Sequence, residues 1–414
     1  MNSEQLLRQV LSISPPWYIR EVDVNKEDGL VEVHVEHREK GAPCPKCGKD
    51  GPGYDTVKRR WRHLDLCEFQ TWIVGDVPRV KCLEHGVLQV QVPWADARSK
   101  FTAPFECVII DWLKEASIQA VARMFQLAWK QVCNIQSRAV KRGLARRGPV
   151  TATKIGVDET SFQKRHEYVT IVTDLNTGGV LHVADNRRQE SFEDFLTRLT
   201  REQLAAIGVV AMDMHAPFIT AAGLHISDLE TKIAFDRFHV AKLFGDAVDK
   251  VRRQENRELA AQGDDRLKGT KYHWLKSPRR MARSVRAELA ALQKTALRVA
   301  RAWAVKEAAS KLWHYRSRTW ATKAWRRLCD WASRSRLTPM VRVARTIRYH
   351  LIGIVNAIVL RVSNASSESI NSKVQGLKRR ANGYRNRERF RDAILFHLGQ
   401  LHLYPDQVAT HSKG

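Results

Sequence analysis

The sequence predicts a multidomain α+β protein: an amino-terminal zinc-ribbon-like β module, a helix-turn-helix, and an α/β core interrupted by a large all-α insertion. The length of 414 residues is well above the usual size of about 150 residues for one domain. Two pairs of closely spaced metal-ligand residues lie within the first 100 residues. Beyond residue 150, strand-like and helical segments alternate, and from residue 241 the pattern is helical alone.

The charge balance indicates a polyanionic partner. The chain has 70 Lys and Arg residues against 44 Asp and Glu, a net charge of +26 and a pI near 10.1. This balance favours nucleic acid first and an anionic membrane surface second. The hydrophobic content of 43% excludes a disordered basic tail. We expect no membrane span, because no apolar run reaches about 18 residues, and no signal peptide, because the amino-terminal residues lack a basic region followed by an apolar core. Seven unevenly spaced cysteines argue against a secreted disulfide framework.

The charge is unevenly distributed along the chain. Residues 151–240 hold 9 basic and 13 acidic residues, whereas residues 241–362 hold 29 basic and 9 acidic residues. An acidic segment inside a basic chain suits a metal-dependent nuclease, because divalent cations turn carboxylates into phosphate-binding groups. The alternative is ordinary variation of surface charge.

Residues 1–100 contain a candidate zinc site. Cys44 and Cys47 form one pair, Cys82 and His85 form a second, and a Gly follows each pair. Two pairs spaced in this way suit a tetrahedral zinc site, and strand-like runs at 31–35, 61–66 and 69–74 predict a small β module around it. His63 and Cys67 lie nearby and are alternative ligands, although a loop His and a buried Cys are the plainer interpretation.

Residues 101–148 predict a helix-turn-helix. One helix spans 105–114 with Val108, Ile109 and Trp112 on one side, and Ser117 caps a second helix. Residues 126–128 form the turn, and a third helix runs over 129–141. The alternative is a plain three-helix bundle. The third helix is expected to turn outward side chains that contact bases and phosphates: Lys130, Gln131, Asn134 and Arg138.

Residues 150–240 predict the first part of an α/β core. Asp158, Asp213 and Asp236 each follow directly after a strand-like run. Three meandering strands followed by crossover units predict a ribonuclease H-like fold, in which the first and fourth strands are neighbours and Asp158 can meet Asp213. Such carboxylates can share divalent metals about 3.5–4 Å apart, although Asp is also common in turns. The expected strands are 154–157, 168–173, 180–184, 209–212 and 232–235, and the expected helices are 191–204 and 216–222.

Residues 241–362 predict a helical insertion. Apolar residues spaced alternately by four and three predict one long helix over 285–303. The high positive charge favours contact with the DNA backbone. The Trp residues of the insertion, Trp325 among them, are expected to pack helices, and stacking on unpaired bases is the alternative. The apolar positions of the long helix are Val285, Leu289, Leu292, Ala296, Val299 and Trp303.

Residues 363–400 predict a return to the core on a helix that carries Glu368, with a tail over 401–414. Glu368 is the sole acidic residue between Asp330 and Glu388, and the helical period places it away from the apolar stripe. The alternative is an ordinary solvent-exposed residue, because a lone Glu on a helix usually lies on the surface. Here it precedes cations of the kind that bind phosphate: Lys378, Arg379, Arg380 and Arg385.

These segments resemble the bacterial insertion-sequence transposases of the ISL-three family. The resemblance rests on GVDETSF, DMHAPF, DRFHV and LKGTKYHWLK, on the amino-terminal CPKCG and KRRWRHLD, on the helix-turn-helix, and most specifically on SNASSESINSKVQGLKRRANGYRNRERFR from Ser363. It covers nearly the whole chain. Two positions depart from the family pattern: Ser369 follows the Glu where Gly is usual, and His85 ends a pair that is more often Cys-x-x-Cys.

The resemblance implies a DDE transposase that cleaves and joins DNA at terminal inverted repeats. The matching triad is Asp158, Asp213 and Glu368, which would hold two Mg²⁺ ions (Mn²⁺ is possible), while Asp236 and His239 would support the site and one Zn²⁺ would be structural. The expected partners are double-stranded DNA and further copies of the chain, as a dimer or higher oligomer, in the bacterial cytoplasm at the nucleoid. Two alternatives remain: a nuclease or resolvase of the same fold, and a catalytically inactive DNA-binding regulator.

Overall fold

The computed structural model divides the chain into two units, each with cores of its own. One unit comprises residues 1–148 with 400–414, and the other comprises residues 149–399. Part of the expected tail is therefore packed: Leu403 is buried, and its carbonyl accepts a hydrogen bond from Arg142 at 2.5 Å. The structure describes residues 3–11, 13–39, 41–163, 167–295, 297–362 and 365–406.

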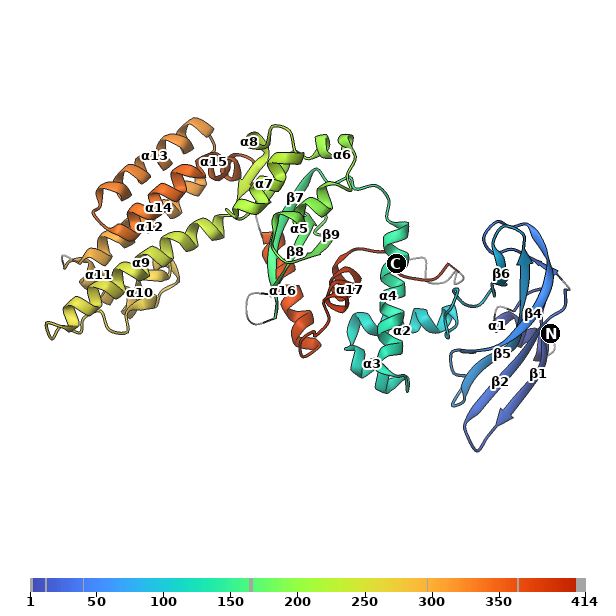
Figure 1. Cartoon of the computed structure of the whole chain (residues 1–414). Coiled ribbons are helices and arrows are strands. Elements are labelled where there is room, and N and C mark those ends of the chain that lie inside the picture. The colour runs from blue at the N-terminus through green and yellow to red at the C-terminus, as the bar shows by residue number, and fades with distance from the viewer. Residues whose placement is uncertain are drawn as a thin grey trace. The chain divides into compact units, whose positions relative to one another are not determined.

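The first unit begins with a six-stranded sheet in the order β1-β2-β5-β4-β3, with β6 added on β5 (Figure 1). Trp17, Trp61 and Trp94 form its centre, with edge-to-face ring contacts at 5.0 and 5.5 Å. The expected strand 61–66 is wrong, because β4 ends at Arg62 and the chain turns at Cys67, whose φ is +56°. The elements are α1 (Ser3–Val10), β1 (Trp17–Asn25), β2 (Leu30–His37), β3 (Gly41–Pro43), β4 (Asp50–Arg62), β5 (Gln70–Cys82) and β6 (Gly86–Gln89).

Three helices complete the first unit: α2 (Ala103–Glu115), α3 (Ile118–Met124) and α4 (Trp129–Arg146). The Ser117 side chain accepts a hydrogen bond from the Ala120 N–H at 3.2 Å, which confirms the predicted cap. Gln126 takes φ +53° in the turn, a conformation that Gly adopts more readily. On the apolar side of α2, Ile109 is buried, Val108 is half-buried, and Trp112 is 42% exposed, in edge contact with Phe125.

The second unit is built on a five-stranded sheet in the order β11-β10-β7-β8-β9. Strands β7, β8 and β9 are antiparallel, and β10 and β11 run parallel to β7. The predicted contact between the first and fourth strands is therefore correct. The predicted end of the first strand, at Val157, was wrong. β7 continues to Gln163 because its pairing with β8 extends that far, and Asp158 therefore lies within the strand. The strands are β7 (Lys154–Gln163), β8 (Glu167–Asp174), β9 (Val180–Asp185), β10 (Val209–Met212) and β11 (Ile233–Phe235).

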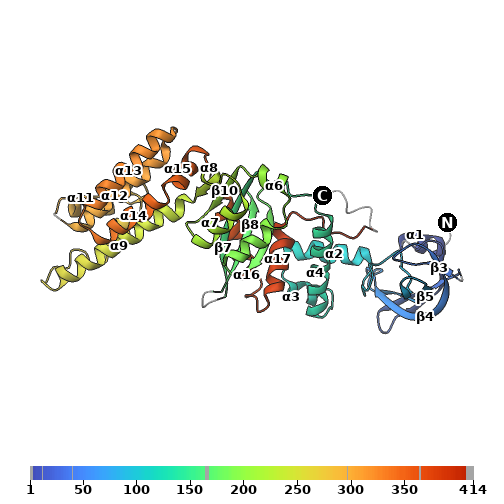
Figure 2. The ribbon, with the colours of Figure 1, turned by 45° about the horizontal axis from the view of Figure 1, so that its top comes forward.

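Helices cover both faces of this sheet (Figure 2). Alternate residues of β8 divide between two cores: Val172 packs with α5 (Gln189–Leu196) and α7 (Ala216–His225), and Ile171 packs with α16 (Ala365–Arg380) and α17 (Arg387–Leu398). The helix expected over 191–204 is interrupted, because Thr200 and Gln203 form a capping box that starts α6 (Arg201–Ala206). A short α8 (Leu229–Lys232) precedes β11.

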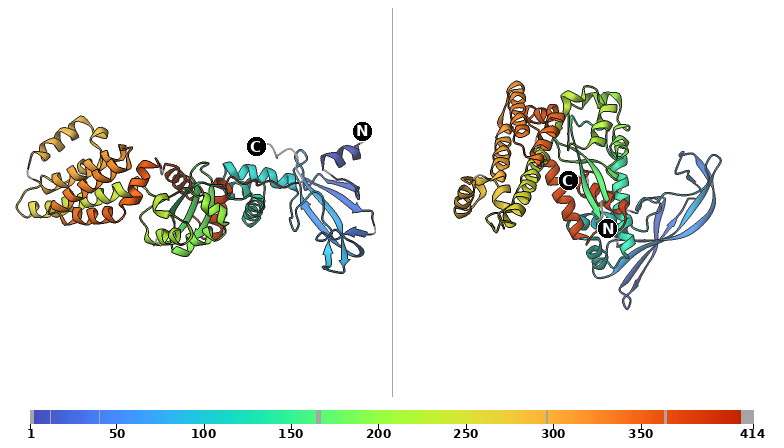
Figure 3. Two further views of the ribbon diagram at one scale, coloured as in Figure 1. Left: turned by 90° about the horizontal axis from the view of Figure 1, so that it is seen from above. Right: turned by 60° about the vertical axis from the view of Figure 1, so that its left-hand side comes forward.

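The insertion is helical, as predicted (Figure 3). The single helix expected over 285–303 is wrong: it is two helices, α11 and α12. The buried carboxylate of Glu255 accepts hydrogen bonds from the N–H groups of Arg298 (2.7 Å) and Val299 (2.8 Å), which caps a new helix there. Ala296 lies outside the described residues. The helices are α9 (Arg237–Ala260), α10 (Lys271–Leu275), α11 (Arg283–Gln293), α12 (Arg298–Lys311), α13 (Arg318–Arg334), α14 (Thr338–Tyr349) and α15 (Leu351–Val359).

Helix α15 joins the insertion to the sheet beside Asp236. A Cβ atom added at Gly353 would lie 2.5 Å from the ring of Phe235, the last residue of β11, so this close contact requires glycine. No helix in the described part of the chain is long and apolar enough to span a membrane.

Trp325 packs the insertion, which confirms the interpretation favoured for it. Its side chain is fully buried, with its ring 5.7 Å from Trp313 and 6.4 Å from Phe244. Trp325→Ala is therefore expected to lower the free energy of unfolding by about 3–5 kcal/mol, measured by denaturant titration. Trp320→Ala is the control, because Trp320 is 59% exposed and its loss should leave the unfolding midpoint unchanged. An unchanged midpoint for Trp325→Ala together with weaker DNA binding would contradict the packing role.

Candidate functional site

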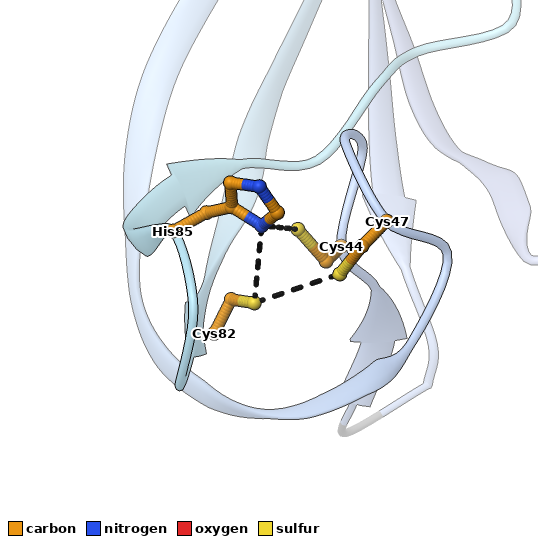
Figure 4. Close-up of side chains that lie close together, drawn as sticks. All are labelled: Cys44, Cys47, Cys82 and His85. Atoms are coloured by element: carbon orange, nitrogen blue, oxygen red, sulfur yellow. Dashed lines mark hydrogen bonds between the residues drawn. The ribbon is translucent and has the colours of Figure 1, made fainter.

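Four side chains from two turns of the amino-terminal sheet converge on one point (Figure 4). Cys44 and Cys47 follow β3, Cys82 ends β5, and His85 lies in the turn to β6. Their ligand atoms all lie within 4.8 Å of one another. The Sγ atoms of Cys47 and Cys82 are 3.7 Å apart, and His85 Nδ1 lies 3.6 Å from Cys82 Sγ and 3.8 Å from Cys44 Sγ.

These separations match the edges of a zinc tetrahedron. With Zn–S near 2.3 Å and Zn–N near 2.0–2.1 Å, neighbouring ligand atoms are about 3.5–3.8 Å apart. Hydrogen bonds from the backbone of Cys47 and Lys46 lower the pKa of the Cys44 thiol to about 6, which favours the thiolate that zinc binds. Gly48 and Gly86 take φ of +71° and +72°, so each turn uses the glycine that follows its ligand pair. The four residues therefore fit one structural Zn²⁺.

The two alternative ligands do not belong to this group. His63 is buried, and its Nδ1 lies 2.9 Å from the Thr102 hydroxyl. Cys67 is exposed in the turn that follows β4. The structure therefore brings together the four zinc ligands that the spacing of the two pairs predicted.

In the second unit, three aspartates lie at one level across neighbouring parallel strands. Ala211 of β10 pairs with Gly156 of β7, so Asp213 and Asp158 stand at the same level two residues further along. The last pair between β10 and β11 directly precedes Asp213 and Asp236. Parallel register therefore places Asp158 and Asp213 at the same level of neighbouring strands, with Asp236 at that level after the next strand.

The carboxyl group of Asp158 is half-buried beside like charges. Burial raises its pKa to about 6; the backbone of Glu159 and the nearby His239 lower it, and Asp213 and Asp236 raise it again. Carboxylate oxygens that repel one another are suited to a divalent cation, which relieves the repulsion. Within the described residues, no three of these acidic and histidine side chains have ligand atoms within 4.8 Å of one another.

Asp236 and His239 form a pair at the start of α9. Asp236 Oδ1 accepts a hydrogen bond from the Phe238 N–H at 2.9 Å, which caps the helix, and Asp236 Oδ2 lies 3.8 Å from His239 Nε2. The pair therefore fixes the direction of α9 next to Asp213. The supporting role that the resemblance implies for this pair stays a prediction.

Helix α16 is fixed along β7 by polar side chains three and four residues apart. The adjoining apolar stripe, about 100° round the helix, is buried through Ile370 and Val374, which confirms the apolar stripe expected on this helix. The polar side chains bond to consecutive parts of β7 beginning at Asp158. The contacts are Asn371 Nδ2 to Asp158 Oδ2 (2.6 Å), Gln375 Nε2 to Thr160 Oγ1 (2.9 Å) and Lys378 Nζ to the Ser161 carbonyl (2.6 Å).

Glu368 lies in the first turn of α16, and its side chain lies outside the described residues. Its position in the chain is three residues before Asn371, and residues three apart share one side of a helix. The polar series at 371, 375 and 378 therefore extends backward to position 368. Lys378 is half-buried and donates a hydrogen bond to the Ser161 carbonyl, whereas Arg379, Arg380 and Arg385 are exposed.

The helix-turn-helix presents a smaller outward set than the sequence predicted. Lys130 is exposed at the start of α4, and Gln131 and Asn134 are half-buried. The outward direction expected for Arg138 is wrong. Its Nε donates to Glu106 Oε1 at 3.1 Å, because Glu106 is only 1% exposed within α2 and a buried carboxylate requires cationic partners.

Residues 155–394 match the transposase domain of the ISL3 family. The chain belongs to this transposase family. Residues 40–85 match the zinc-finger of transposase IS204/IS1001/IS1096/IS1165, and residues 90–140 match the helix-turn-helix domain of transposase family ISL3. These matches confirm the resemblance drawn from the sequence, and they place the chain in a family of enzymes that act on DNA.

Two relatives are similar over most of their length. A transposase for insertion sequence element IS1557 from Mycobacterium tuberculosis is 27% identical over 93% of this chain and 93% of its own. A transposase for insertion sequence element IS1001 from Bordetella parapertussis is 24% identical over 87% of this chain and 89% of its own.

Sequence reasoning missed the residues of this transposase that hold α16 on β7. Asn371 and Gln375 have no chemistry that marks them singly as site residues. Their spacing from Glu368 and Lys378, by steps of three and four, is the signal that was available. A regularly spaced polar series beside the apolar stripe of the same helix indicates that the helix is packed along both.

Proposed function

We propose that this chain is a DDE transposase that cleaves DNA at the ends of its element and transfers the freed 3′-hydroxyl to target DNA. The observation that carries the proposal is that Asp158 and Asp213 stand at the same level of neighbouring parallel strands. The hydrogen bond from Asn371 of α16 to Asp158 supports it, because Asn371 lies one helical turn after Glu368. The strand order β11-β10-β7-β8-β9, with three antiparallel strands followed by two parallel ones, supports a ribonuclease H-like core.

Asp158, Asp213 and Glu368 are proposed as the ligands of two Mg²⁺ ions, for which Mn²⁺ can substitute. When bound, such ions lower the pKa of a water nucleophile and stabilise the charge on the leaving 3′-oxygen. The raised pKa of Asp158 supports a cation site, because burial, with a smaller contribution from Asp213 and Asp236, makes its ionised form unfavourable without a cation. Asn371 orients the Asp158 carboxylate, and the Asp236–His239 pair holds α9 against the same edge.

The other segments are proposed to bind DNA. The zinc module of residues 1–100 and the helix-turn-helix of 101–148 would recognise the terminal inverted repeats through Lys130, Gln131 and Asn134. The basic insertion of 241–362 would hold flanking or target DNA, and the catalytic core would comprise 150–240 and 363–400. The exposed Arg379, Arg380 and Arg385 are proposed to contact DNA beside Glu368. We further propose that the protein works as a dimer or higher oligomer at the nucleoid in the cytoplasm.

A strand-transfer assay tests the proposal against its two alternatives. The substrate is a duplex with the inverted repeats that flank the coding sequence, supplied intact or pre-cleaved, with Mg²⁺ and a target plasmid. A transposase is expected to cleave the intact duplex and to join the pre-cleaved duplex to the plasmid. Cutting without joining would favour a nuclease or resolvase, and binding without either reaction would favour an inactive regulator.

A further inference from the structure

A basic pocket lies in the first unit, between the sheet and the start of α4. It has a volume of about 630 Å³, and its walls include Lys58, Arg59 and Arg60 of β4, and Arg98 and Lys100 of the loop before α2. Trp72, Phe101 and Gln131 complete the lining. Five cations around one hollow repel one another, and a bound anion would relieve that repulsion.

Two of the five cations have partners within the chain and form the walls. Arg59 donates to the Gln89 side chain (2.9 Å) and to the Ser99 carbonyl (3.2 Å), which ties β4 to the loop. Arg60 pairs with Glu32 at 2.7 Å, and its guanidinium lies 4.0 Å from the centre of the Trp72 ring. Both guanidinium groups are therefore held in fixed positions.

The other three cations are available to a ligand. Lys58, Arg98 and Lys100 are exposed, and within the described part of the chain none of them forms an ion pair. Arg98 has φ +64°, a conformation that is unfavourable for a residue with a side chain and that is often found at functional positions. Arg98 and Lys100 are the neighbours of Ser99 in the chain, and Ser99 is fully buried. The two cations therefore lie on either side of the residue that anchors the loop.

The loop is fixed to the helix-turn-helix. Ser99 Oγ donates to Glu106 of α2 at 2.8 Å, and the same carboxyl group accepts hydrogen bonds from Arg138 and Arg142 of α4. The carbonyl of Lys100 accepts from the N–H of Arg62 in β4 at 3.0 Å. The pocket cations and α4 are thus parts of one hydrogen-bonded framework, and Gln131 of α4 itself lines the pocket.

We propose that this pocket is a binding site for the phosphodiester backbone of double-stranded DNA, next to the segment read by α4. Lys58, Arg98 and Lys100 contact phosphates and contribute affinity without sequence preference, while Lys130 and the neighbouring side chains of α4 face bases. The inference rests on the proposed function, because it takes DNA as the ligand. It assigns to the sheet a phosphate-contacting surface beside the helix-turn-helix, whose α4 side chains contact bases.

The test compares two charge-matched triple variants of the full chain. Lys58→Gln, Arg98→Gln and Lys100→Gln are combined in one, and Arg20→Gln, Lys26→Gln and Lys81→Gln in the other. In the second set, Arg20 and Lys81 lie on strands of the same sheet and Lys26 lies in the turn after β1; all three are exposed, and none of them lines the pocket. Affinity for end-containing and scrambled duplexes is measured over a range of salt concentrations, without magnesium. Zinc content and the thermal unfolding midpoint are measured to verify that both variants fold.

The pocket variant is expected to bind both duplexes about 100-fold more weakly at 0.15 M salt, with the slope of log K against log salt reduced by about 3. The control variant should retain the parental slope within about 1. The double variant Lys58→Gln with Lys100→Gln should lose about 2 units of slope, which separates phosphate contacts from a folding defect. Equal slopes for the pocket and control variants would overturn the pocket proposal while leaving the proposed function intact. A parental chain that prefers neither duplex would instead count against the proposed function.

Discussion

Replacing Asp158 by Asn is expected to reduce DNA cleavage by roughly 10³-fold or more, because it removes a charge that the proposed metal site requires. Asp213→Asn and Glu368→Gln should have effects of similar size, since each keeps the shape of the side chain and removes its charge. Binding to end-containing DNA should remain close to that of the parent. The measurement is cleavage of a labelled duplex in Mg²⁺, with affinity determined in parallel.

The Asp158 variant is also expected to keep its fold. Because the pKa of Asp158 is raised to about 6 from 3.8, the folded state loses stability as the pH rises through that window and carries the full cost above about pH 6. Asn has no such cost, so the metal-free variant at pH 8 should unfold at the same temperature as the parent or higher. The Asn371 amide can rotate to keep its bond to residue 158.

Asp246→Asn is the matched control, because Asp246 is exposed on α9 and undergoes the same chemical change. It should retain parental cleavage. An Asp158→Asn protein that cleaves within about tenfold of the parent would refute the triad. Normal cleavage by Glu368→Gln alone would move the third position elsewhere, and Glu388 would be tested next.

Much of the candidate site could be predicted because its residues are marked by local chemistry. Two ligand pairs spaced by two residues specify a zinc site by themselves, and the four predicted ligands are the four that converge. Asp213 and Asp236 stand directly after short buried strands, where residue pattern alone located them. The strand order followed from the succession of elements, because the rules for connections leave few arrangements.

The features that escaped prediction depend on residues distant in the chain. The end of β7 is set by its pairing with β8, and the break between α11 and α12 is set by Glu255, which is 43 residues before the N–H group it first caps. Arg138 turns inward because Glu106, 32 residues earlier, is buried and requires a cation. Periodicity reports which side of a helix is apolar, but it does not report such partners.

Removal of the zinc ligands is expected to have the second large effect. Cys44→Ser or Cys82→Ser should lower the zinc content from about one ion per chain to near zero, because tetrahedral zinc binding requires all four ligands. The four ligands connect the turn after β3 to the turn between β5 and β6, so these ends of the sheet should unfold locally when zinc is lost. Metal analysis and protease sensitivity of the purified variants measure both changes.

The functional consequence should fall on DNA recognition rather than on chemistry. The zinc ligands belong to the first unit and the three aspartates to the second, so zinc loss should reduce affinity for end-containing DNA by at least about tenfold while joining of pre-positioned ends changes less. Cys67→Ser is the control, since Cys67 is exposed and outside the ligand group, and it should keep its zinc and its affinity. Parental protein without zinc would refute the site, and zinc-free variants that bind ends normally would refute its role in recognition. Equal losses of end binding and of joining would mean that zinc supports the folding of both units, because a recognition module that acts alone cannot change the chemistry of ends already in position.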